Sequence, residues 1–208
     1  MSDRAPRHFS MIRSFHLADV FTLLNGFFGA GAVLAFMRFV ADGEKKHFWL
    51  GFALLPLALI MDILDGRIAR LRGKSSPMGQ ELDSLADIVS FGVAPAAMAF
   101  AAGLRGGWDA VCLVYFVGCG ISRLARYNVS ASAAAAASAK VKYFEGFPIP
   151  SSLLLVALLA TLAALGRWQE AIPLGTMSLG GLTFHPLALV FGVHGSLMIS
   201  KTLHIPKP

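Results

Sequence analysis

The sequence predicts an all-α, polytopic membrane protein with six transmembrane helices. Hydrophobic residues make up 56% of the 208 residues and charged residues only 14%, a composition too apolar for an ordinary soluble domain. A membrane-spanning helix needs about 20 mostly apolar residues. Six such runs occur, at roughly 17–40, 48–71, 79–104, 108–129, 149–166 and 179–200. Little chain is left for a separate soluble module, so residues 1–208 are expected to form a single membrane domain.

The first sixteen residues precede the first apolar run. Arg4, Arg7 and Arg13 are interleaved there with apolar side chains. This pattern is typical of a helix that lies in the membrane–water interface. Because the apolar run that follows is too long for a signal peptide, we expect residues 1–16 to form a short interfacial helix.

The basic residues are distributed unequally between the two sides of the membrane. With a cytosolic N-terminus, six helices place 13 of the 18 basic residues on the cytosolic side. An excess of Lys and Arg is typical of cytosolic loops. We therefore expect both termini, and the turn at Arg72 to Met78, to lie in the cytosol. The remaining five basic residues are Arg38, Lys45, Lys46, Arg105 and Arg167.

The first apolar run contains one amide side chain, Asn25, followed by Gly26, Gly29 and Gly31. Small residues let another backbone or a ligand approach closely. From the residues alone, Asn25 is equally consistent with a hydrogen bond between helices and with a functional role.

Four carboxylates lie at the end of the second run and the start of the third. Asp62 and Asp65 are three residues apart, and Asp83 and Asp87 are four apart. Both spacings place the two members of a pair on one face of a helix. Two antiparallel helices joined by a short turn would bring the pairs opposite each other. Because isolated buried acids are costly, such a cluster predicts bound cations.

The residues between the acids are small or basic. Gly66 and Ala69 share the stripe of Asp62 and Asp65, which leaves room for a flat or phosphorylated ligand. Arg70 is placed to meet an anion, whereas Arg67 and Arg72 are expected to be membrane anchors. In the turn, Ser76 suits a helix N-cap and Pro77 the first helical position.

The third run repeats the alternation of small residues and acids. Gly79, Asp83, Asp87 and Ser90 recur at intervals of four and three residues. An all-oxygen ligand set without His or Cys favours a hard cation, Mg²⁺ or Mn²⁺, over zinc. Two such ions can act as a clamp for displacement at phosphorus, so the cluster predicts phosphoryl-group chemistry on a membrane substrate.

The rest of the chain carries fewer chemical signals. Arg123 and Arg126 lie near the cytosolic end of the fourth run and suit either membrane anchoring or an anion. Residues 130–147 are expected to form a loop with an alanine-rich spacer. The fifth run has no ionisable residue and is interpreted as scaffold. In the sixth run, His194 and Ser200 are interpreted as packing residues rather than catalytic ones.

Residues 62–87 follow the pattern D-x2-D-G-x2-A-R-x8-G-x3-D-x3-D. This pattern resembles the signature of the CDP-alcohol phosphatidyltransferase family at every fixed position. The segments QELDSLADIVSFGVAPA, SRLARYNV, YFEGFPIP and the terminal HG and SKTLHIPKP resemble the members that use CDP-diacylglycerol and L-serine. The likeness covers nearly the whole chain.

The resemblance implies six transmembrane helices, a homodimer and an active site open to the cytosolic leaflet. It further implies that Asp62 and Asp83 bridge two divalent cations, that Asp65 binds one, and that Asp87 binds the other and acts as the base. Two residues, Arg123 and Arg126, are assigned to the serine carboxylate, which needs a cationic partner. The residues assigned to CDP-diacylglycerol are Asn25, Gly26, Gly66, Ala69, Arg70, Ser76 and Gly79.

The implied reaction is a direct displacement in which the serine hydroxyl attacks the phosphorus and CMP leaves. A covalent intermediate is disfavoured because the motif offers no His, Cys or base-paired Ser as nucleophile. Other acceptors, such as inositol, glycerol 3-phosphate or choline, stay open because the signature concerns only the CDP half of the substrate. A cation transporter is a weaker alternative, since transporters favour sites near the midplane. The membrane would be the endoplasmic reticulum in a eukaryote and the inner membrane in a bacterium.

Overall fold

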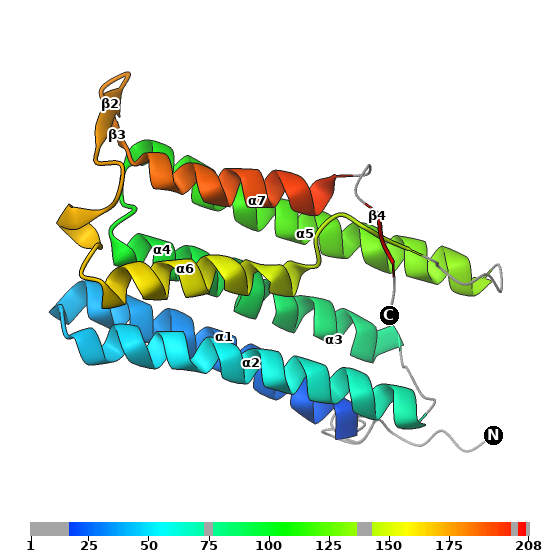
Figure 1. Ribbon diagram of the computed structural model, residues 1–208. Helices are drawn as coiled ribbons and strands as arrows, with labels where there is room; N and C mark the ends of the chain where they lie inside the picture. Colours follow the sequence, from blue (N-terminus) through cyan, green and yellow to red (C-terminus); the bar gives the residue numbers. More distant parts are fainter. Residues whose placement is uncertain (1–16, 73–76, 137–142, 201–203, 207–208) are drawn as a thin grey trace, which may run out of the picture.

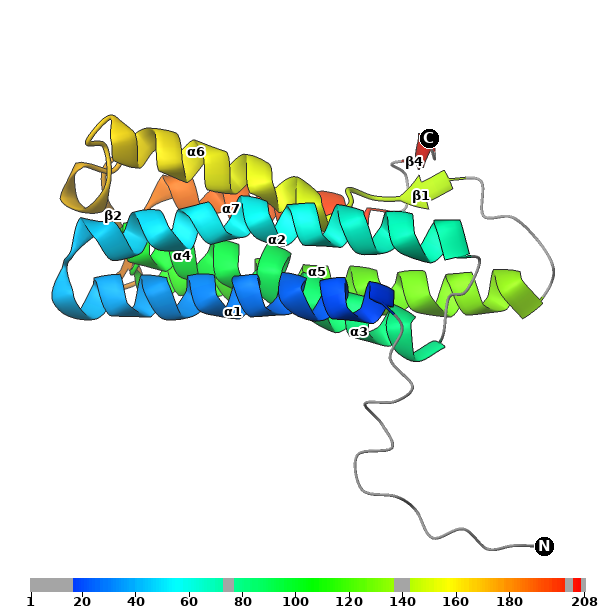
Figure 2. The ribbon, with the colours of Figure 1, turned by 90° about the horizontal axis from the view of Figure 1, so that it is seen from below.

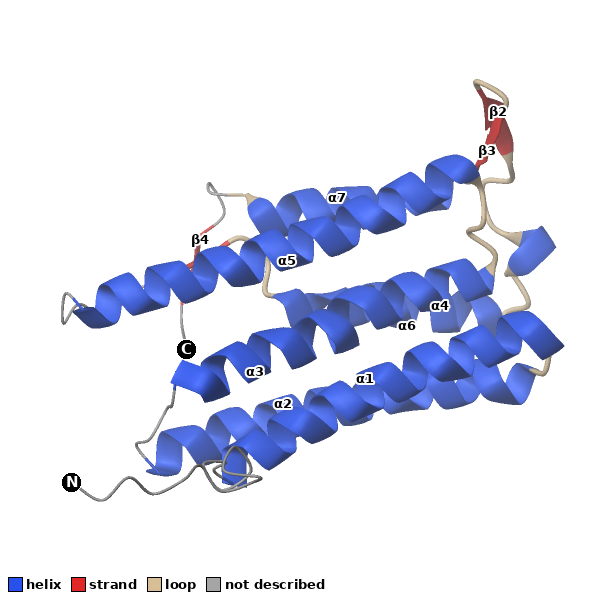
Figure 3. Ribbon diagram, turned by 180° about the vertical axis from the view of Figure 1, so that it is seen from behind, coloured by secondary structure: helices blue, strands red, loops and turns tan. Residues whose placement is uncertain are grey.

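The computed structural model describes residues 17–72, 77–136, 143–200 and 204–206. Its helices run roughly parallel and form an elongated bundle in three tiers (Figures 1 and 3). The first tier consists of α1 (Leu17–Asp42) and α2 (Lys45–Arg72), which lie side by side (Figure 2). The second tier consists of α3 (Pro77–Asp87), α4 (Ala94–Ala102) and α6 (Leu153–Ala164). The third consists of α5 (Gly107–Ala136) and α7 (Leu189–Ile199).

Four helical stretches in these ranges are long and apolar enough to cross a membrane. Two shorter apolar helices, Ile149–Ala164 and Pro186–Ile199, complete the bundle. They include the short 3-10 segments η3 (Ile149–Ser152) and η5 (Pro186–Ala188), and a third such segment is η4 (Gln169–Ala171). The main elements are thus all helical, as predicted. The four long stretches are Ala18–Asp42, Lys45–Ile68, Met78–Ala102 and Gly107–Ala131.

The third long stretch changes its winding directly after Asp87. Residues Ile88–Val93 form a π-helical segment, η2, and the Ala94 N–H donates to the carbonyl of Val89, five residues earlier. Pro95 lies in the first turn of α4. Proline has no N–H and its ring crowds the carbonyl four residues before it, so a wider turn accommodates it. Single π-helical turns of this kind are frequent at functional sites.

Two sequence-based boundaries are wrong. The sixth helix begins at Pro186 and not at residue 179, because β2 (Met177–Leu179) and β3 (Leu182–Phe184) form an antiparallel hairpin. Gly180 and Gly181 both have positive φ and form its tip. The loop expected from residue 130 begins later, because α5 continues to Ala136. Alanine is the strongest helix former, which explains the extension.

A second pair of strands joins distant parts of the chain. β1 (Tyr143–Glu145) pairs antiparallel with β4 (His204–Pro206), and Phe144 lies opposite Ile205. These strands come from two of the segments that carry the family resemblance, YFEGFPIP and SKTLHIPKP.

The hydrophobic core is rich in aromatic side chains. Phe36, Phe39 and Phe48 are fully buried where α1 meets α2. The Trp168 ring stacks on Phe39 with centroids 5.3 Å apart. Another buried pair, Phe116 and Phe191, joins α5 to α7 edge to face. These aromatic contacts join the helices within the first tier and within the third tier.

The start of α1, the end of α2, the start of α3 and the end of α7 lie at one end of the bundle (Figure 1). The four carboxylates of the motif lie toward this end, and we call it the acidic end. Pro77 is the first residue of α3, as expected. The interfacial helix predicted for residues 1–16 and the N-cap predicted at Ser76 lie outside the described residues.

Candidate active site

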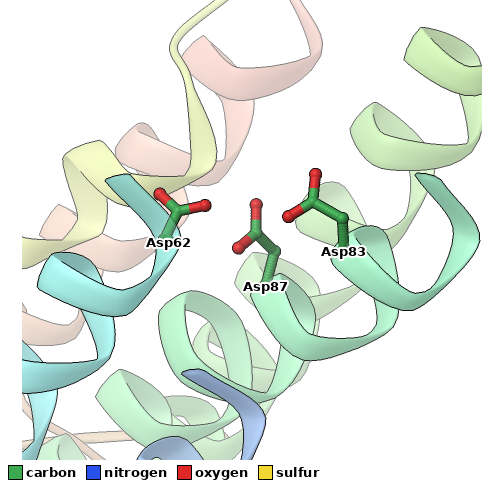
Figure 4. A group of neighbouring side chains, drawn as sticks. All are labelled: Asp62, Asp83 and Asp87. Carbon is green, nitrogen blue, oxygen red and sulfur yellow. The ribbon is translucent and has the colours of Figure 1, made fainter. Parts of the chain in front are cut away.

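Three of the four carboxylates of the motif converge between α2 and α3 (Figure 4). Asp62 comes from α2, and Asp83 and Asp87 come from successive turns of α3. One carboxylate oxygen of each lies within 4.8 Å of the others, a spacing that could hold a metal ion. The antiparallel approach of α2 and α3, expected from the short turn, thus brings the two acid pairs together.

Asp65 is buried beside this group and is held separately. The Thr22 hydroxyl on α1 donates a 2.7 Å hydrogen bond to Asp65 Oδ2, and both side chains are buried. Asp65 still lies close enough to interact electrostatically with Asp62 and Asp83. The fourth carboxylate therefore contributes to the charge of the cluster while a neighbouring helix fixes its position.

Asn25 on α1 provides a second link to the acids. Its Nδ2 donates to Asp87 Oδ1 at 3.1 Å, and its backbone carbonyl accepts a 2.9 Å hydrogen bond from the Ser90 hydroxyl. The Asn25 side chain is fully buried, yet its Oδ1 has no hydrogen-bond partner. The hydrogen bond between helices, one of the two possibilities for Asn25, is therefore observed, and one polar atom is still available to a ligand.

Glycine allows α1 to approach closely enough for these bonds. A Cβ placed on Gly29 would lie 2.7 Å from the Ser90 Cα, nearer than real contacts allow. At Gly26 the corresponding atom would lie 3.5 Å from the Ala86 Cβ, an ordinary contact. The close approach predicted for this glycine-containing face is thus made by the backbone of η2 at Gly29.

The four acids are not joined by salt bridges to basic side chains of the described residues. Asp83 Oδ1 is buried and has no hydrogen-bond partner. Ionised carboxylates grouped in this way repel one another and lose hydration, so the donor set fits hard cations with oxygen ligands.

The two arginines assigned to serine differ in their surroundings. Arg123 is half-buried, interacts electrostatically with Asp87, and has an Nε without a hydrogen-bond partner. Arg126 instead donates from Nη1 to the Ile199 carbonyl at 3.2 Å, at the C-terminal end of α7. The pair is therefore split: Arg123 lies beside the acids, whereas Arg126 caps a helix.

Four of the other residues assigned to CDP-diacylglycerol belong to α2 and α3, and the fifth, Ser76, lies outside the described residues. Apart from its chain neighbours and the nearby backbone of α2, no atom of the described residues lies within 4 Å of a Cβ placed on Gly66, so space is open there. The exposed Arg70 donates from Nε to the Gly66 carbonyl at 3.1 Å. Gly79 is half-buried in the first turns of α3, and the backbone of Ala69 belongs to α2.

Several polar residues of the site were missed by the sequence interpretation. Thr22 and Asp19 both lie near Asp65, and Asp19 is a further buried acid. On the other side, Asn128 of α5 donates to the Ser84 hydroxyl at 3.0 Å and to Glu81 at 3.3 Å. The spacing of Thr22 and Asn25, three residues apart and so on one helix face, was the available signal.

His194 has the packing role expected for it. It is buried, its ring contacts Phe116 and Phe147, and its Nε2 forms a 3.1 Å hydrogen bond with the Ser151 hydroxyl. These contacts lie between α5, η3 and α7, and none involves the acids.

The helical bundle with its acidic cluster is that of a membrane protein with a candidate divalent-metal site. A sequence profile of the CDP-alcohol phosphatidyltransferase family matches residues 15–193. The chain belongs to this family and is an integral, multi-pass membrane protein.

Curated relatives narrow the comparison. The CDP-diacylglycerol–serine O-phosphatidyltransferase of Saccharomyces cerevisiae is 48% identical over 204 residues, which cover 97% of this chain and 74% of the yeast protein. Enzymes of the same name from Mycobacterium leprae and Helicobacter pylori are 41% and 37% identical over 60% and 65% of this chain. These two matches span 41% and 56% of the respective bacterial proteins.

Proposed function

We propose that this protein is a phosphatidylserine synthase, a CDP-diacylglycerol–serine O-phosphatidyltransferase. It transfers the phosphatidyl group of CDP-diacylglycerol to the hydroxyl of L-serine and releases CMP. The convergence of Asp62, Asp83 and Asp87 carries the phosphatidyl-transfer part of the proposal. Similarity to the yeast serine enzyme along nearly the whole chain supports serine as the acceptor.

Two divalent cations, Mg²⁺ or Mn²⁺, are assigned to the four acids. Asp62, Asp65, Asp83 and Asp87 would together supply the carboxylate ligands of these ions. The unpartnered Asp83 Oδ1 and the purely carboxylate donor set fit this assignment. When bound, the ions hold the diphosphate and stabilise the negative charge on departing CMP.

The chain's own residues then carry out a direct displacement. Asp87 accepts the proton of the serine hydroxyl, and the serine oxygen forms a bond to the phosphorus that bears diacylglycerol. The bond from this phosphorus to the CMP oxygen breaks, and CMP leaves with the electron pair. The hydrogen bond from Asn25 holds the Asp87 carboxylate in position during proton transfer.

The nucleotide–lipid head is assigned to the space around Gly66. The open Cβ position there lets the diphosphate approach the backbone, and Ala69 leaves room for cytidine. Arg70, Ser76 and Gly79 complete the contacts on the α2–α3 side. Asn25 and Gly26 complete them on the α1 side, where Asn25 Oδ1 is an unused acceptor.

Serine is placed between the acids and α5. Its carboxylate pairs with the Arg123 guanidinium, whose Nε is unpartnered, while its hydroxyl faces Asp87. Arg126 contributes by holding α7 against α5. Of the two arginines that the sequence analysis assigned to the serine carboxylate, only Arg123 is now proposed to contact it.

We also infer the membrane arrangement from the charge distribution and the family resemblance. Six helices cross the membrane, with α6 and α7 as the fifth and sixth, and the acidic end faces the cytosol. The protein is a homodimer. It lies in the endoplasmic reticulum membrane if the source is eukaryotic and in the inner membrane if the source is bacterial.

Release of CMP tests the proposal directly. Purified protein is incubated with Mn²⁺ or Mg²⁺ and CDP-diacylglycerol, and CMP is measured before and after L-serine is added. We expect CMP and phosphatidylserine to appear together and only with serine. Equal release with inositol, glycerol 3-phosphate or choline would refute serine as the acceptor, and no release with any alcohol would refute the enzyme class.

A further inference from the structure

The β2–β3 hairpin extends sideways from the end of the bundle opposite the acidic end (Figures 1 and 3). From Ala171 to Phe184 the chain has no ionisable side chain. Three of its apolar side chains are more than half exposed: Leu174 by 74%, Met177 by 59% and Leu179 by 58%. An uncharged hairpin with exposed apolar side chains is unusual for a loop in water, and the catalytic proposal makes no use of it.

The hairpin is fixed to the first turn of α5. Trp108 donates from Nε1 to the Leu179 carbonyl at 2.9 Å. A Cβ on Gly107 would lie 3.1 Å from the Leu182 side chain, so β3 packs directly on this glycine. Behind β3, the His185 N–H donates to Asp109 Oδ1 at 2.8 Å. These contacts set the height of the hairpin relative to α5.

The hairpin lies beside the start of a candidate membrane span. The apolar stretch of α5 that is long enough to cross begins at Gly107, next to the hairpin. The helix that follows the hairpin, Pro186–Ile199, is only about 21 Å long at about 1.5 Å per residue. This length is short of a hydrocarbon core of about 30 Å, so the chain preceding Pro186 lies near membrane depth.

We propose that the β2–β3 hairpin is an interfacial anchor, which inserts Met177, Leu179 and Leu174 into the bilayer that holds the protein. The exposed apolar side chains of the hairpin contact lipid at the boundary between headgroups and acyl chains. The sheet has only two strands, so its outer edges need water or headgroups as hydrogen-bond partners, which excludes the hydrocarbon centre. The partly exposed Trp108 is of the type enriched at this level.

Spin-label accessibility in lipid nanodiscs tests the proposal. A nitroxide is attached to Met177→Cys, and separately to Leu179→Cys, in the full chain with Cys112 and Cys119 replaced by Ala. Glu44→Cys, in the exposed turn between α1 and α2 at the same end, is the matched aqueous control. Collision rates with oxygen and with a water-soluble nickel chelate are compared. If the cysteine-free background is inactive, the parent chain is labelled and its own signal is subtracted.

At residues 177 and 179 we expect oxygen to relax the label several-fold more effectively than the nickel chelate does, with the reverse at residue 44. Equal behaviour at all three positions would overturn the proposal, because the hairpin would then be an aqueous loop. Dipolar coupling between labels, with both collision rates low, would also overturn it, because a second copy of the chain would cover the hairpin. None of these readouts depends on catalytic activity.

Discussion

Buried acids occur at both ends of the bundle, and they differ in how completely the chain provides their hydrogen-bond partners. Asp109, at the start of α5, is fully buried and accepts three hydrogen bonds. They come from the Gly106 N–H at 2.7 Å, the His185 N–H at 2.8 Å and His185 Nδ1 at 2.6 Å. At the acidic end, Asp83 Oδ1 and Asn25 Oδ1 are buried without a partner, and Arg123 Nε is unpartnered beside them.

This contrast separates an acid that is satisfied by the chain from the acids that we assign to bound metal ions. Natural proteins satisfy nearly all buried polar atoms, so Asp109 is explained by the chain alone. The acidic end is not satisfied by the chain, and its unpartnered atoms surround three converging carboxylates. Ligands with positive charge and hydrogen-bonding groups are therefore expected at the acidic end.

Metal removal should have the largest effect on activity, and this effect should depend only on the carboxylates of the acidic end. Chelation by EDTA should abolish CMP release, and Mn²⁺ should restore it. Saturation at about 100 times the Kd should stabilise the fold by about 2.7 kcal/mol, measured as a rise in the Tm. The rise should persist in Asp109→Asn and disappear in Asp62→Asn/Asp83→Asn. A rise of equal size in the latter variant would place the metal elsewhere.

Asp87→Asn should show the next largest effect. Loss of a general base lowers kcat by about 10²- to 10⁴-fold, while CDP-diacylglycerol binding should stay detectable. The measurement is single-turnover CMP release together with equilibrium binding of the lipid. Normal turnover in Asp87→Asn would remove the base assignment.

Asp109→Asn provides the matched comparison at the other end. An amide cannot accept all three hydrogen bonds, and each unsatisfied buried group costs about 1–3 kcal/mol. We expect a lower Tm in nanodiscs and a kcat of the folded fraction within about two-fold of the wild type, since Asp109 touches none of the reacting groups. A large loss of kcat without a loss of stability would contradict its structural role.

The two ends of the bundle also differ in how much of their structure could be predicted from the sequence. The spacing of Asp62, Asp65, Asp83 and Asp87 was sufficient to predict that they face each other, because helix periodicity and a short turn act locally. Local patterns do not specify which residue of α1 meets which acid. The bonds from Thr22 to Asp65 and from Asn25 to Asp87 join residues 43 and 62 positions apart and depend on tertiary packing.

The far end was predicted less well for a related reason. An apolar stretch from residue 179 to 200 has the composition of a helix, but consecutive glycines at the hairpin tip stop the helix from extending before Pro186. Asp109 likewise gave no signal, since its partners are two backbone N–H groups and a histidine 76 residues away. Hydropathy predicts membrane segments but does not predict how buried acids are satisfied.

Arg123→Gln and Arg126→Gln should separate substrate binding from packing. Hydrogen bonds to charged groups contribute about 1.5–3 kcal/mol. At about 1.4 kcal/mol per tenfold, Arg123→Gln should raise the KM for serine about 10- to 100-fold. The KM for CDP-diacylglycerol should change little. Arg126→Gln should lower the Tm and leave the serine KM near its original value. The opposite pattern would exchange the two roles.

Thr22→Val should give the smallest effect, because it removes a single hydroxyl, which donates to Asp65 and to the Ala18 carbonyl, and keeps every carboxylate. Valine matches threonine in shape, so Asp65 loses its 2.7 Å donor without a new cavity. A net hydrogen bond is worth about 1 kcal/mol, which corresponds to about a five-fold rise in the Mn²⁺ concentration for half-maximal activity. Thr22→Ser keeps the hydroxyl, so the Mn²⁺ concentration for half-maximal activity should stay at the wild-type value. If both variants needed the same raised Mn²⁺ concentration, packing at Thr22 rather than its hydrogen bond to Asp65 would be responsible.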